Sequence, residues 1–200
     1  DGNIISYDAS GNPVAIATGS DGQVLTSAGA GAPPAFEAAS YALVASTTIA
    51  DSAVTSISIT GLDLDAHISY FMELEIVGAG SHGRLKICAN NLQTDTDYWS
   101  QSVHANGSGA AGNEENNTRI SYIFPSMFSK CAIDISYATG RYFVAVAKTH
   151  RQNASTDWYS EVQGVRKTVE LAANLTRIDL VHTTSSSIGV GSKMRLYKRI

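Results

Sequence analysis

The sequence lacks any block of lysine or arginine residues. Its 200 residues include 14 basic and 18 acidic side chains, which gives a formal net charge of −4. A protein that binds nucleic acid through the phosphate backbone needs a basic patch or stripe, and this chain has no run that would form one. The sequence therefore argues against a nucleic-acid partner.

Long apolar runs are also missing. No stretch approaches the roughly 18 apolar residues that a membrane-spanning helix requires, so we expect no membrane insertion. No signal peptide is visible. The chain starts at Asp1 rather than at methionine, and we expect an upstream segment to have been removed or to lie outside this sequence.

Cysteine is scarce as well. The two cysteines, Cys88 and Cys131, stand in segments that alternate like strands. A disulfide and a pair of buried free thiols both fit the sequence, and buried thiols are the preferred interpretation. Free thiols would fit assembly in a reducing cytoplasm.

Motifs that would indicate an enzyme or a bound cofactor are incomplete. Residues 78–83, Gly-Ala-Gly-Ser-His-Gly, fit the G-x-G-x-x-G fingerprint of dinucleotide-binding folds, but that fingerprint needs a helix to follow. Residues 84–89 alternate like a strand instead, so we interpret the glycines as a hairpin turn. Residues 189–193 lack the spacing of a phosphate loop, and no Gly-x-Ser-x-Gly elbow occurs. The sequence thus predicts neither catalytic activity nor a cofactor.

No set of metal ligands is recognisable by spacing either. No two of the five histidines lie within ten residues of each other. Asp63 with Asp65, and Asp95 with Asp97, could supply the oxygen ligands that calcium prefers, yet neither pair continues as an EF-hand loop. Turn formation is the preferred interpretation, and we expect no metal.

The chain does contain a series of short strand-like segments. From Tyr41 to Ile200, apolar runs recur every eight to twelve residues between Gly, Asn, Asp and Ser. This spacing is typical of an antiparallel β-sandwich, and we expect a jelly-roll-like one. Period-two alternation predicts which side chains face the core. They are Ile57 and Ile59; Ile68, Tyr70, Met72, Leu74 and Ile76; Leu85 and Ile87; Ile133 and Ile135; Ile178 and Leu180; Met194 and Leu196.

Three other segments give more specific expectations. Residues 142–147 are apolar on both faces, which predicts a central strand or one that packs against a neighbouring subunit. Residues 104–117 are polar and rich in glycine and asparagine, which predicts a long loop. Residues 175–182 and 189–197 are expected to form an antiparallel pair, joined by a loop over 183–188.

Two pairs of adjacent aromatic residues are candidates for ligand contact. Neighbouring residues of a strand point to opposite faces, so one ring of Tyr98-Trp99 and one of Trp158-Tyr159 should remain outside the core. An exposed ring with polar neighbours can stack on the apolar face of a sugar. We therefore take Trp99, Trp158 and Tyr159 as possible glycan contacts. The alternative interpretation, which is preferred, is that the outer ring packs against a partner subunit.

The first 38 residues differ in composition from the rest of the chain. They contain short apolar segments separated by Gly, Ala, Ser and Pro, and the composition of residues 28–39 is typical of a linker. So little apolar surface cannot offset the entropy of ordering the chain. We therefore expect this segment to be completed by copies of itself. The apolar residues concerned are Ile4, Ile5, Tyr7, Val14, Ile16, Val24, Leu25 and Phe36.

The same segment resembles a recurrent element of bacteriophage fibre and virion-appendage proteins. In that element a Gly-x-x-Gly-Gln-Val-Leu run is followed about ten residues later by Gly, Pro and an aromatic residue. The matching residues are Gly19, Gly22, Gln23, Val24, Leu25, Gly31, Pro33 or Pro34, and Phe36, where many family members have Trp. Residues 1–16 also look like the two strands that precede this run in the family. Residues 175–182 and 189–197 resemble the last strands of a jelly-roll-like domain of phage structural proteins.

The resemblance implies a virion structural protein, a subunit of a homotrimeric tail fibre, head fibre, spike or head decoration. Residues 1–38 would form the trimerising segment that contacts other virion proteins of the capsid or tail. Residues 39–200 would form the outer β-sandwich that contacts a host cell-surface glycan. Localisation would be the virion, assembled in the host cytoplasm. The alternative is a β-sandwich carbohydrate-binding module whose first 38 residues are only a linker.

Overall fold

A computed structural model describes residues 3–65, 69–106, 109–115, 119–123, 125, 127–152, 158–168 and 170–199. The chain divides into two compact units, residues 1–42 and residues 43–199. The described residues form antiparallel strands and one short 3-10 turn, with no α-helix, so the predicted all-β class is confirmed. No helix in these ranges has the length and apolar character needed to cross a membrane.

The strands of the first unit are β1 (Ile4–Tyr7), β2 (Pro13–Ile16), β3 (Gln23–Thr26) and β4 (Ala35–Ala38). The chain then continues through β5 (Tyr41–Thr48), β6 (Ser56–Thr60), β7 (Ser69–Val77), β8 (Gly83–Ala89), η1 (Asp95–Asp97), β9 (Tyr98–Asn106), β10 (Gly109–Glu115), β11 (Arg119–Ile123), β12 (Phe128–Ser136), β13 (Val144–Gln152), β14 (Trp158–Lys167), β15 (Arg177–His182) and β16 (Lys193–Arg199).

The first unit consists of two separate two-stranded sheets. β1 pairs with β2, and β3 pairs with β4. The first turn is closed by Asp8, whose carboxylate accepts hydrogen bonds from the backbone of Ser10 and Asn12, both at 2.8 Å. These bonds, the one from Asn12 foremost, lower the pKa of Asp8 below its ordinary value of 3.8. A two-stranded hairpin has only one partner for each strand, so little apolar surface is covered.

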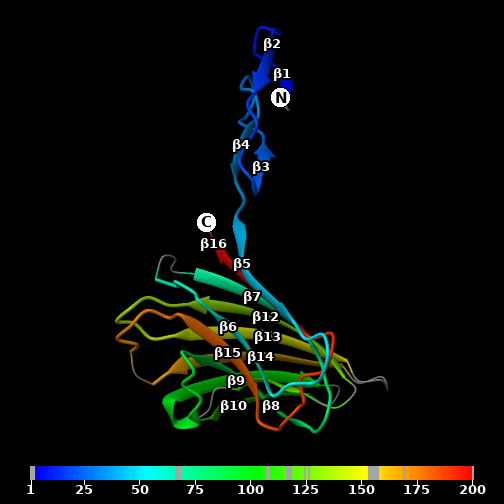
Figure 1. Cartoon of the computed structure of the whole chain (residues 1–200), viewed down its shortest axis with the longest axis vertical. Helices are drawn as coiled ribbons and strands as arrows, with labels where there is room; N and C mark the ends of the chain where they lie inside the picture. The colour runs from blue at the N-terminus through cyan, green and yellow to red at the C-terminus, as the bar shows by residue number, and fades with distance from the viewer. Residues whose placement is uncertain are drawn as a thin grey trace. The chain divides into compact units, whose positions relative to one another are not determined.

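The second unit is built from two antiparallel sheets. The large sheet has the order β10-β9-β14-β13-β12-β7-β16-β5, and the small sheet has the order β11-β8-β15-β6 (Figure 1). From β6 to β9 successive strands alternate between the sheets, and the chain later passes to the small sheet at β11 and again at β15. Connections that cross between sheets bring residues far apart in the chain into one core.

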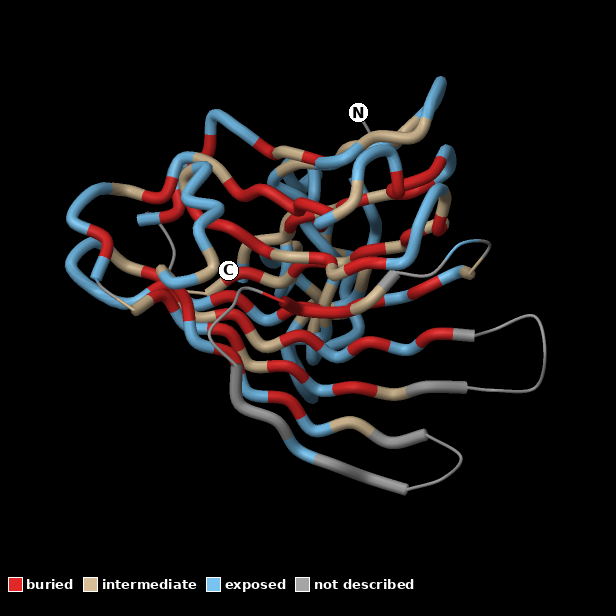
Figure 2. Tube along the Cα trace, turned by 90° about the horizontal axis from the view of Figure 1, so that it is seen from below, coloured by how far each residue is buried: buried red, intermediate tan, exposed pale blue. Residues whose placement is uncertain are grey.

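The two sheets share one hydrophobic core. It includes Ile57 and Ile59 of β6, Leu85 and Ile87 of β8, and Ile178 and Leu180 of β15 from the small sheet. The large sheet contributes Tyr70, Met72, Leu74 and Ile76 of β7, Ile133 and Ile135 of β12, and Met194 and Leu196 of β16. Along most strands of the second unit, buried residues alternate with half-buried or exposed ones (Figure 2). The predicted core-facing set is thereby confirmed, apart from Ile68, which lies outside the described residues.

Residues 142–147 were predicted to form a central strand or one that packs against a neighbouring subunit, and β13, which begins at Val144, confirms the central strand. It pairs with β12 on one side and β14 on the other. Phe143, Ala145 and Ala147 are buried in the core between the sheets. Val144 and Val146 lie on the other face and are half-buried.

The long loop predicted over residues 104–117 is wrong. Within it, β10 pairs with β9 in full register, from Gly109 opposite Asn106 to Glu115 opposite Ser100. β10 is the edge strand of the large sheet. An edge strand needs backbone partners on one side only and can consist of small and polar residues, which the sequence pattern does not distinguish from a loop.

Two predicted antiparallel pairs are also wrong. β7 and β8 flank the glycines of residues 78–83, but β7 lies in the large sheet and β8 in the small one, so the turn is a crossover rather than a hairpin. β15 and β16 likewise belong to different sheets. Alternation shows which side chains are buried, and it is the same whichever sheet the strand joins.

The interior changes from apolar to polar toward β11, β13 and β14. Arg119 of β11 lies 3.3 Å from the carboxylate of Glu161 on β14, and Arg151 of β13 lies 3.5 Å from the same carboxylate. All three side chains are almost fully buried. Arg119 and Arg151 also lie over the ring of Tyr122, at 4.5 and 5.9 Å from its centroid. A buried, shared carboxylate thus joins the two sheets at this end.

Candidate functional site

The Gly-Gln-Val-Leu run contains the turn that precedes β3. The backbone N–H of Gln23 donates to the Ser20 carbonyl at 3.1 Å, and the backbone N–H of Ser20 donates to the Gln23 side chain at 2.6 Å. Gly22 has a φ of 82°, a conformation that glycine adopts at little cost. Glycine and glutamine at these two positions therefore fix the turn that starts the hairpin.

The first glycine of the run has a packing role. A Cβ added to Gly19 would lie 2.6 Å from Cγ of Phe36, closer than real side chains approach. The Phe36 ring, on β4, therefore packs directly on the backbone of Gly19. This contact couples the start of the motif to the aromatic residue that ends it.

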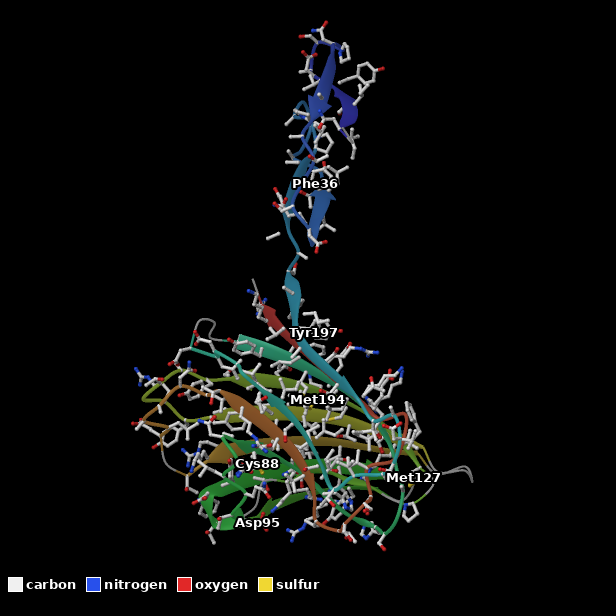
Figure 3. The ribbon with its side chains drawn as sticks, viewed as in Figure 1. Phe36, Cys88, Asp95, Met127, Met194 and Tyr197 are labelled. Carbon is white, nitrogen blue, oxygen red and sulfur yellow. The ribbon has the colours of Figure 1, made fainter. Side chains whose placement is uncertain are left out.

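Most of the apolar residues in the predicted self-association segment are not buried. Ile16 is buried, and Val14 and Phe36 are half-buried. Ile4, Ile5, Tyr7, Val24 and Leu25 are exposed, with 70% of Ile5 and 65% of Tyr7 accessible. Phe36 is labelled among the side chains of this unit in Figure 3. Val14, Ile16, Pro33, Pro34 and Phe36 line a hollow of about 390 Å³. One chain alone leaves this unit with open apolar surface.

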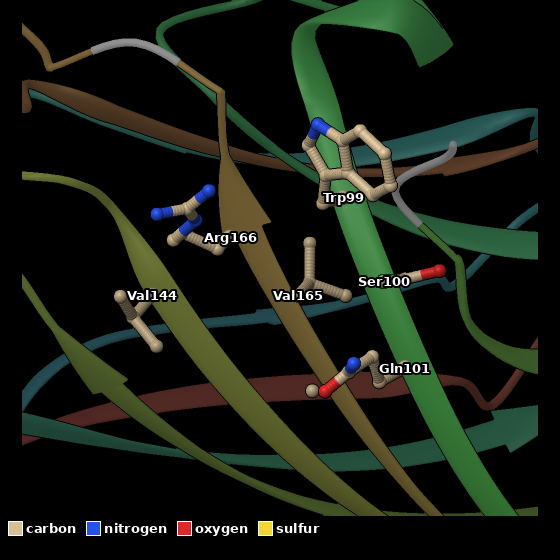
Figure 4. Close-up of a pocket in the computed structure, with 7 residues that line it drawn as sticks. Trp99, Ser100, Gln101, Val144, Val165 and Arg166 are labelled. Atoms are coloured by element: carbon tan, nitrogen blue, oxygen red, sulfur yellow. The ribbon is translucent and has the colours of Figure 1, made fainter. Parts of the chain in front are cut away.

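The second candidate site is a groove on the outer face of the large sheet. Its volume is about 480 Å³, and it is lined by Trp99, Ser100, Gln101, Val144, Gly164, Val165 and Arg166. The strands that form its floor are neighbours, since β14 pairs with both β13 and β9. Figure 4 shows Arg166 between Trp99 and Val144. This agrees with the register, in which Arg166 is opposite both.

The adjacent aromatic residues at the start of β9 divide between core and surface, as predicted. Tyr98 is fully buried, and 43% of Trp99 is accessible. The Tyr98 hydroxyl accepts a hydrogen bond from the Ala89 N–H at 3.0 Å and donates to the Leu92 carbonyl at 2.9 Å. Burial raises the pKa of this hydroxyl well above its ordinary value. Tyr98 thus anchors the start of the strand that presents Trp99.

Arg166 is the charged side chain of the groove. Its guanidinium lies 4.7 Å from the ring centroid of Tyr142. Among the described residues it forms no ion pair, in contrast to Arg84, Arg177 and Arg195, each of which lies within 4.0 Å of a carboxylate. The residues beside it on the outer face, Trp99, Val144 and Gly164, carry no charge. The groove therefore combines an aromatic ring with a cation that no carboxylate of the described residues neutralises.

Two further aromatic candidates belong to the strand next to β9. Trp158 and Tyr159 belong to β14, but their side chains lie outside the described residues. Arg166, Tyr142 and Gly164 were not predicted as site residues from the sequence. The available signal was Gly164, because glycine inside an alternating strand often marks a place where another group approaches the backbone.

The carboxylates considered as calcium ligands hold loops together. Asp63 accepts a hydrogen bond from the Asn174 side chain at 2.7 Å, and Asp65 accepts one from the Thr139 backbone at 2.7 Å. Asp95 lies 3.2 Å from the Lys86 ammonium group. Within the ranges that the structure describes, no three His, Cys, Asp or Glu side chains gather as a metal site would require.

Both cysteines are buried thiols rather than a disulfide, which confirms the preferred interpretation. Cys88 is labelled inside the second unit in Figure 3. Burial raises the pKa of the Cys131 thiol to about 12. A thiol with so high a pKa is not a nucleophile at neutral pH.

Comparison with known proteins adds little. No protein-family model matches the chain, and no curated protein matches its sequence. A search of solved structures gives the VP2 subviral particle of infectious bursal disease virus at 13% identity and a TM-score of 0.16. The alignment covers 94% of this chain and 50% of that one, so this chain spans about half of its length. A superposition of this quality supports no conclusion about fold or function.

Proposed function

We propose that this chain is a bacteriophage virion structural protein, a subunit of a homotrimeric fibre or spike on the tail or the head. Residues 1–38 associate with two further copies and with other virion proteins. Residues 39–200 form the outer domain that contacts the host surface. The proposal assigns the protein no catalytic step and no cofactor, and it places the protein in the virion after assembly in the host cytoplasm.

The observation that carries this proposal is the exposed apolar surface of the first unit. Isolated two-stranded hairpins are marginally stable at best in water. Here two hairpins leave Ile5, Tyr7 and Val24 open to solvent. Copies arranged around a common axis would cover all of these side chains at once, because a symmetric assembly repeats the same contact. That the assembly contains three chains is inferred from the resemblance to phage fibre elements.

The strand order of the second unit supports a jelly-roll β-sandwich. A jelly roll has eight strands in two Greek keys, four in each sheet. The strands β6, β15, β8 and β11 occupy one sheet in that order, and β7, β14, β9 and β10 follow the matching order in the other. β12 and β13 are then a hairpin inserted beside β14, and β5 and β16 extend the sheet beyond β7. Viral capsid and lectin domains are among the proteins built this way.

Labelling of virus particles tests the proposal. Antibodies against the second unit are applied to purified particles of the phage that encodes this chain, and bound antibody is located by electron microscopy. We expect label at a fixed place on the head or tail of intact particles. Label that stays entirely in the particle-free fraction of the lysate would overturn the assignment to the virion.

A second function, a carbohydrate-binding module without a fibre role, is favoured by the groove beside Trp99. An aromatic ring flanked by polar side chains is a common sugar platform. Under this alternative, residues 1–38 are only a linker. Their deletion would then leave unchanged both the number of chains per molecule in solution and the affinity for sugar. Under the fibre proposal, the same deletion converts the trimer to single chains.

A further inference from the structure

The groove on the outer face of the large sheet has the parts needed to bind one sugar ring. Trp99 stands at one side with its ring open to solvent. Gly164 on β14 lies two residues from Arg166 and opposite Gln101 of β9. A Cβ built on Gly164 would meet only the Gln101 carbonyl, at 3.9 Å. Because glycine has no side chain, the floor of the groove is low at Gly164, and this leaves space beside the indole ring of Trp99.

The charge in this groove is the more specific feature. The Arg166 guanidinium lies over the Tyr142 ring, 4.7 Å from its centroid. A planar guanidinium can stack on an aromatic face and still direct its N–H groups outward in its own plane. Those N–H groups match the two oxygens of a carboxylate. Tyr142 thus positions the cation, and no carboxylate of the described chain neutralises it.

The polar group next to Trp99 fits the same ligand. Gln101 lies two residues along β9 on the outer face and lines the groove. Its amide can donate to a sugar hydroxyl and accept from another. A stacking ring, a bidentate cation and an amide therefore face one space of about 480 Å³. A neutral ligand would leave the cation unused.

We propose that this groove binds an acidic sugar, that is, a pyranose that carries a carboxylate. The apolar face of the ring stacks on Trp99, the carboxylate pairs with Arg166, and the hydroxyls bond to Gln101. This inference rests on the proposed contact between the outer domain and host glycan. It is independent of the trimer and of the location on the particle, which the antibody labelling and the molecular mass test separately.

Calorimetry with a matched pair of sugars tests this proposal. Methyl galacturonoside and methyl galactoside share the ring and differ at C6, where one has a carboxylate and the other a hydroxymethyl group. For the full chain we expect the galacturonoside to bind about tenfold more tightly, the gain expected of a bidentate charged hydrogen bond at an exposed site. The Arg166→Gln variant should lose that preference, and Trp99→Ala should weaken both sugars about tenfold or more.

The matched control is Arg195→Gln. Arg195 also lies on the large sheet, but it is 3.8 Å from Glu73 and outside the groove. This variant should keep the preference for the acidic sugar. Equal affinity for the two sugars, a preference that survives Arg166→Gln, or binding of neither sugar would each overturn the proposal. None of Trp99, Arg166 and Arg195 is buried, so far-ultraviolet circular dichroism should show all three variants folded.

Discussion

The guanidinium of Arg119 lies 3.3 Å from the carboxylate of Glu161, in the buried space between the two sheets. Arg119 belongs to the small sheet and Glu161 to the large one. Arg151 approaches the same carboxylate at 3.5 Å, so one acid faces two buried cations. The Arg119 guanidinium also donates to the Ser102 hydroxyl at 3.3 Å, and Arg151 donates to the Tyr122 carbonyl at 3.3 Å. These contacts tie the sheets together where the core is least apolar.

Replacing this acid should therefore be costly. In Glu161→Gln two buried guanidinium groups lose their counter-charge, and we expect a loss of about 3–5 kcal/mol in the free energy of unfolding. Urea unfolding followed by circular dichroism measures it. The control is Glu75→Gln, whose carboxylate pairs with Lys130 and Lys193 at the surface. That change should cost less than about 1 kcal/mol. Equal losses in the two variants would contradict the structural role of Glu161.

Tyr98→Phe should destabilise the protein because it removes one buried hydroxyl. The Ala89 N–H and the Leu92 carbonyl would both lose their partner. We expect a loss of about 1–3 kcal/mol in the free energy of unfolding. In Tyr197→Phe, where the hydroxyl donates to the half-buried Glu73 carboxylate, the loss should be much smaller. If Tyr98→Phe were as stable as the unmodified chain, the hydroxyl would not anchor β9.

Two glycine substitutions should act in opposite directions. Gly164→Ala introduces a Cβ into nearly open space, and the smaller entropy of the unfolded chain should stabilise the protein by about 0.4–1 kcal/mol. Gly189→Ala places a Cβ 2.9 Å from the Val77 carbonyl and 3.3 Å from the Ala79 Cβ. Overpacking against backbone should cost about 1–3 kcal/mol. Thermal or urea unfolding of both variants checks the sign. A stabilised Gly189→Ala would show that the crossover after β7 is looser than described.

Stability should fall at alkaline pH partly because of Cys131. Burial raises the pKa of this thiol from 9.0 to about 12 in the folded chain. Between these two values the unfolded chain has lost the proton and the folded chain still holds it. The free energy of unfolding therefore falls as pH rises, by up to about 1.4 kcal/mol per pH unit from this group. Below pH 9 its contribution is constant.

Urea unfolding at pH 8 and pH 10.5, compared between the unmodified chain and Cys131→Ala, isolates this effect. The variant lacks the thiol, so it should lose less stability between the two pH values. The variant should be less stable at pH 8 because it lacks side-chain atoms. This does not affect the comparison, which uses the change in the free energy of unfolding between the two pH values within each protein. Identical losses in the two proteins would show that the thiol is not protected from ionisation.

The sequence predicted burial well and connectivity poorly. The alternation along β7, β8 and β12 identified the core-facing residues because a half-buried strand has a period of two in any sheet. The same alternation gave no information on partners, so β7 with β8 and β15 with β16 were wrongly paired. β10 was missed because its glycine, alanine and asparagine residues look like a loop, and only its pairing with β9 makes it a strand.

The site was predicted in part for the same reason. The sequence predicted that one ring of the Tyr98-Trp99 pair would lie outside the core, since adjacent strand residues face opposite ways. The structure shows that this ring is Trp99. Arg166 and Tyr142 could not be found, because they meet Trp99 only through the pairing of β13, β14 and β9. In the first unit the glycines of the motif were recognisable in the sequence. The contact of Gly19 with the Phe36 ring could not be predicted, because only the fold brings these two residues together.

The variant that tests the first unit combines Ile5→Ser, Tyr7→Ser and Val24→Ser. All three side chains are exposed in the single chain, so the substitutions should not disturb the core of the second unit. If copies of the chain cover these side chains, the variant should be a single chain in solution with unchanged stability of residues 43–199. A variant that keeps the same molecular mass as the unmodified protein would place the self-association surface elsewhere.

Light scattering coupled to size exclusion, applied to the unmodified full chain in physiological buffer, tests the central claim most directly. Because we propose that two sister chains cover the exposed hairpins of residues 1–38, the measured mass should be three times the 21.1 kDa of one chain. A folded protein with the mass of one chain would contradict the claim.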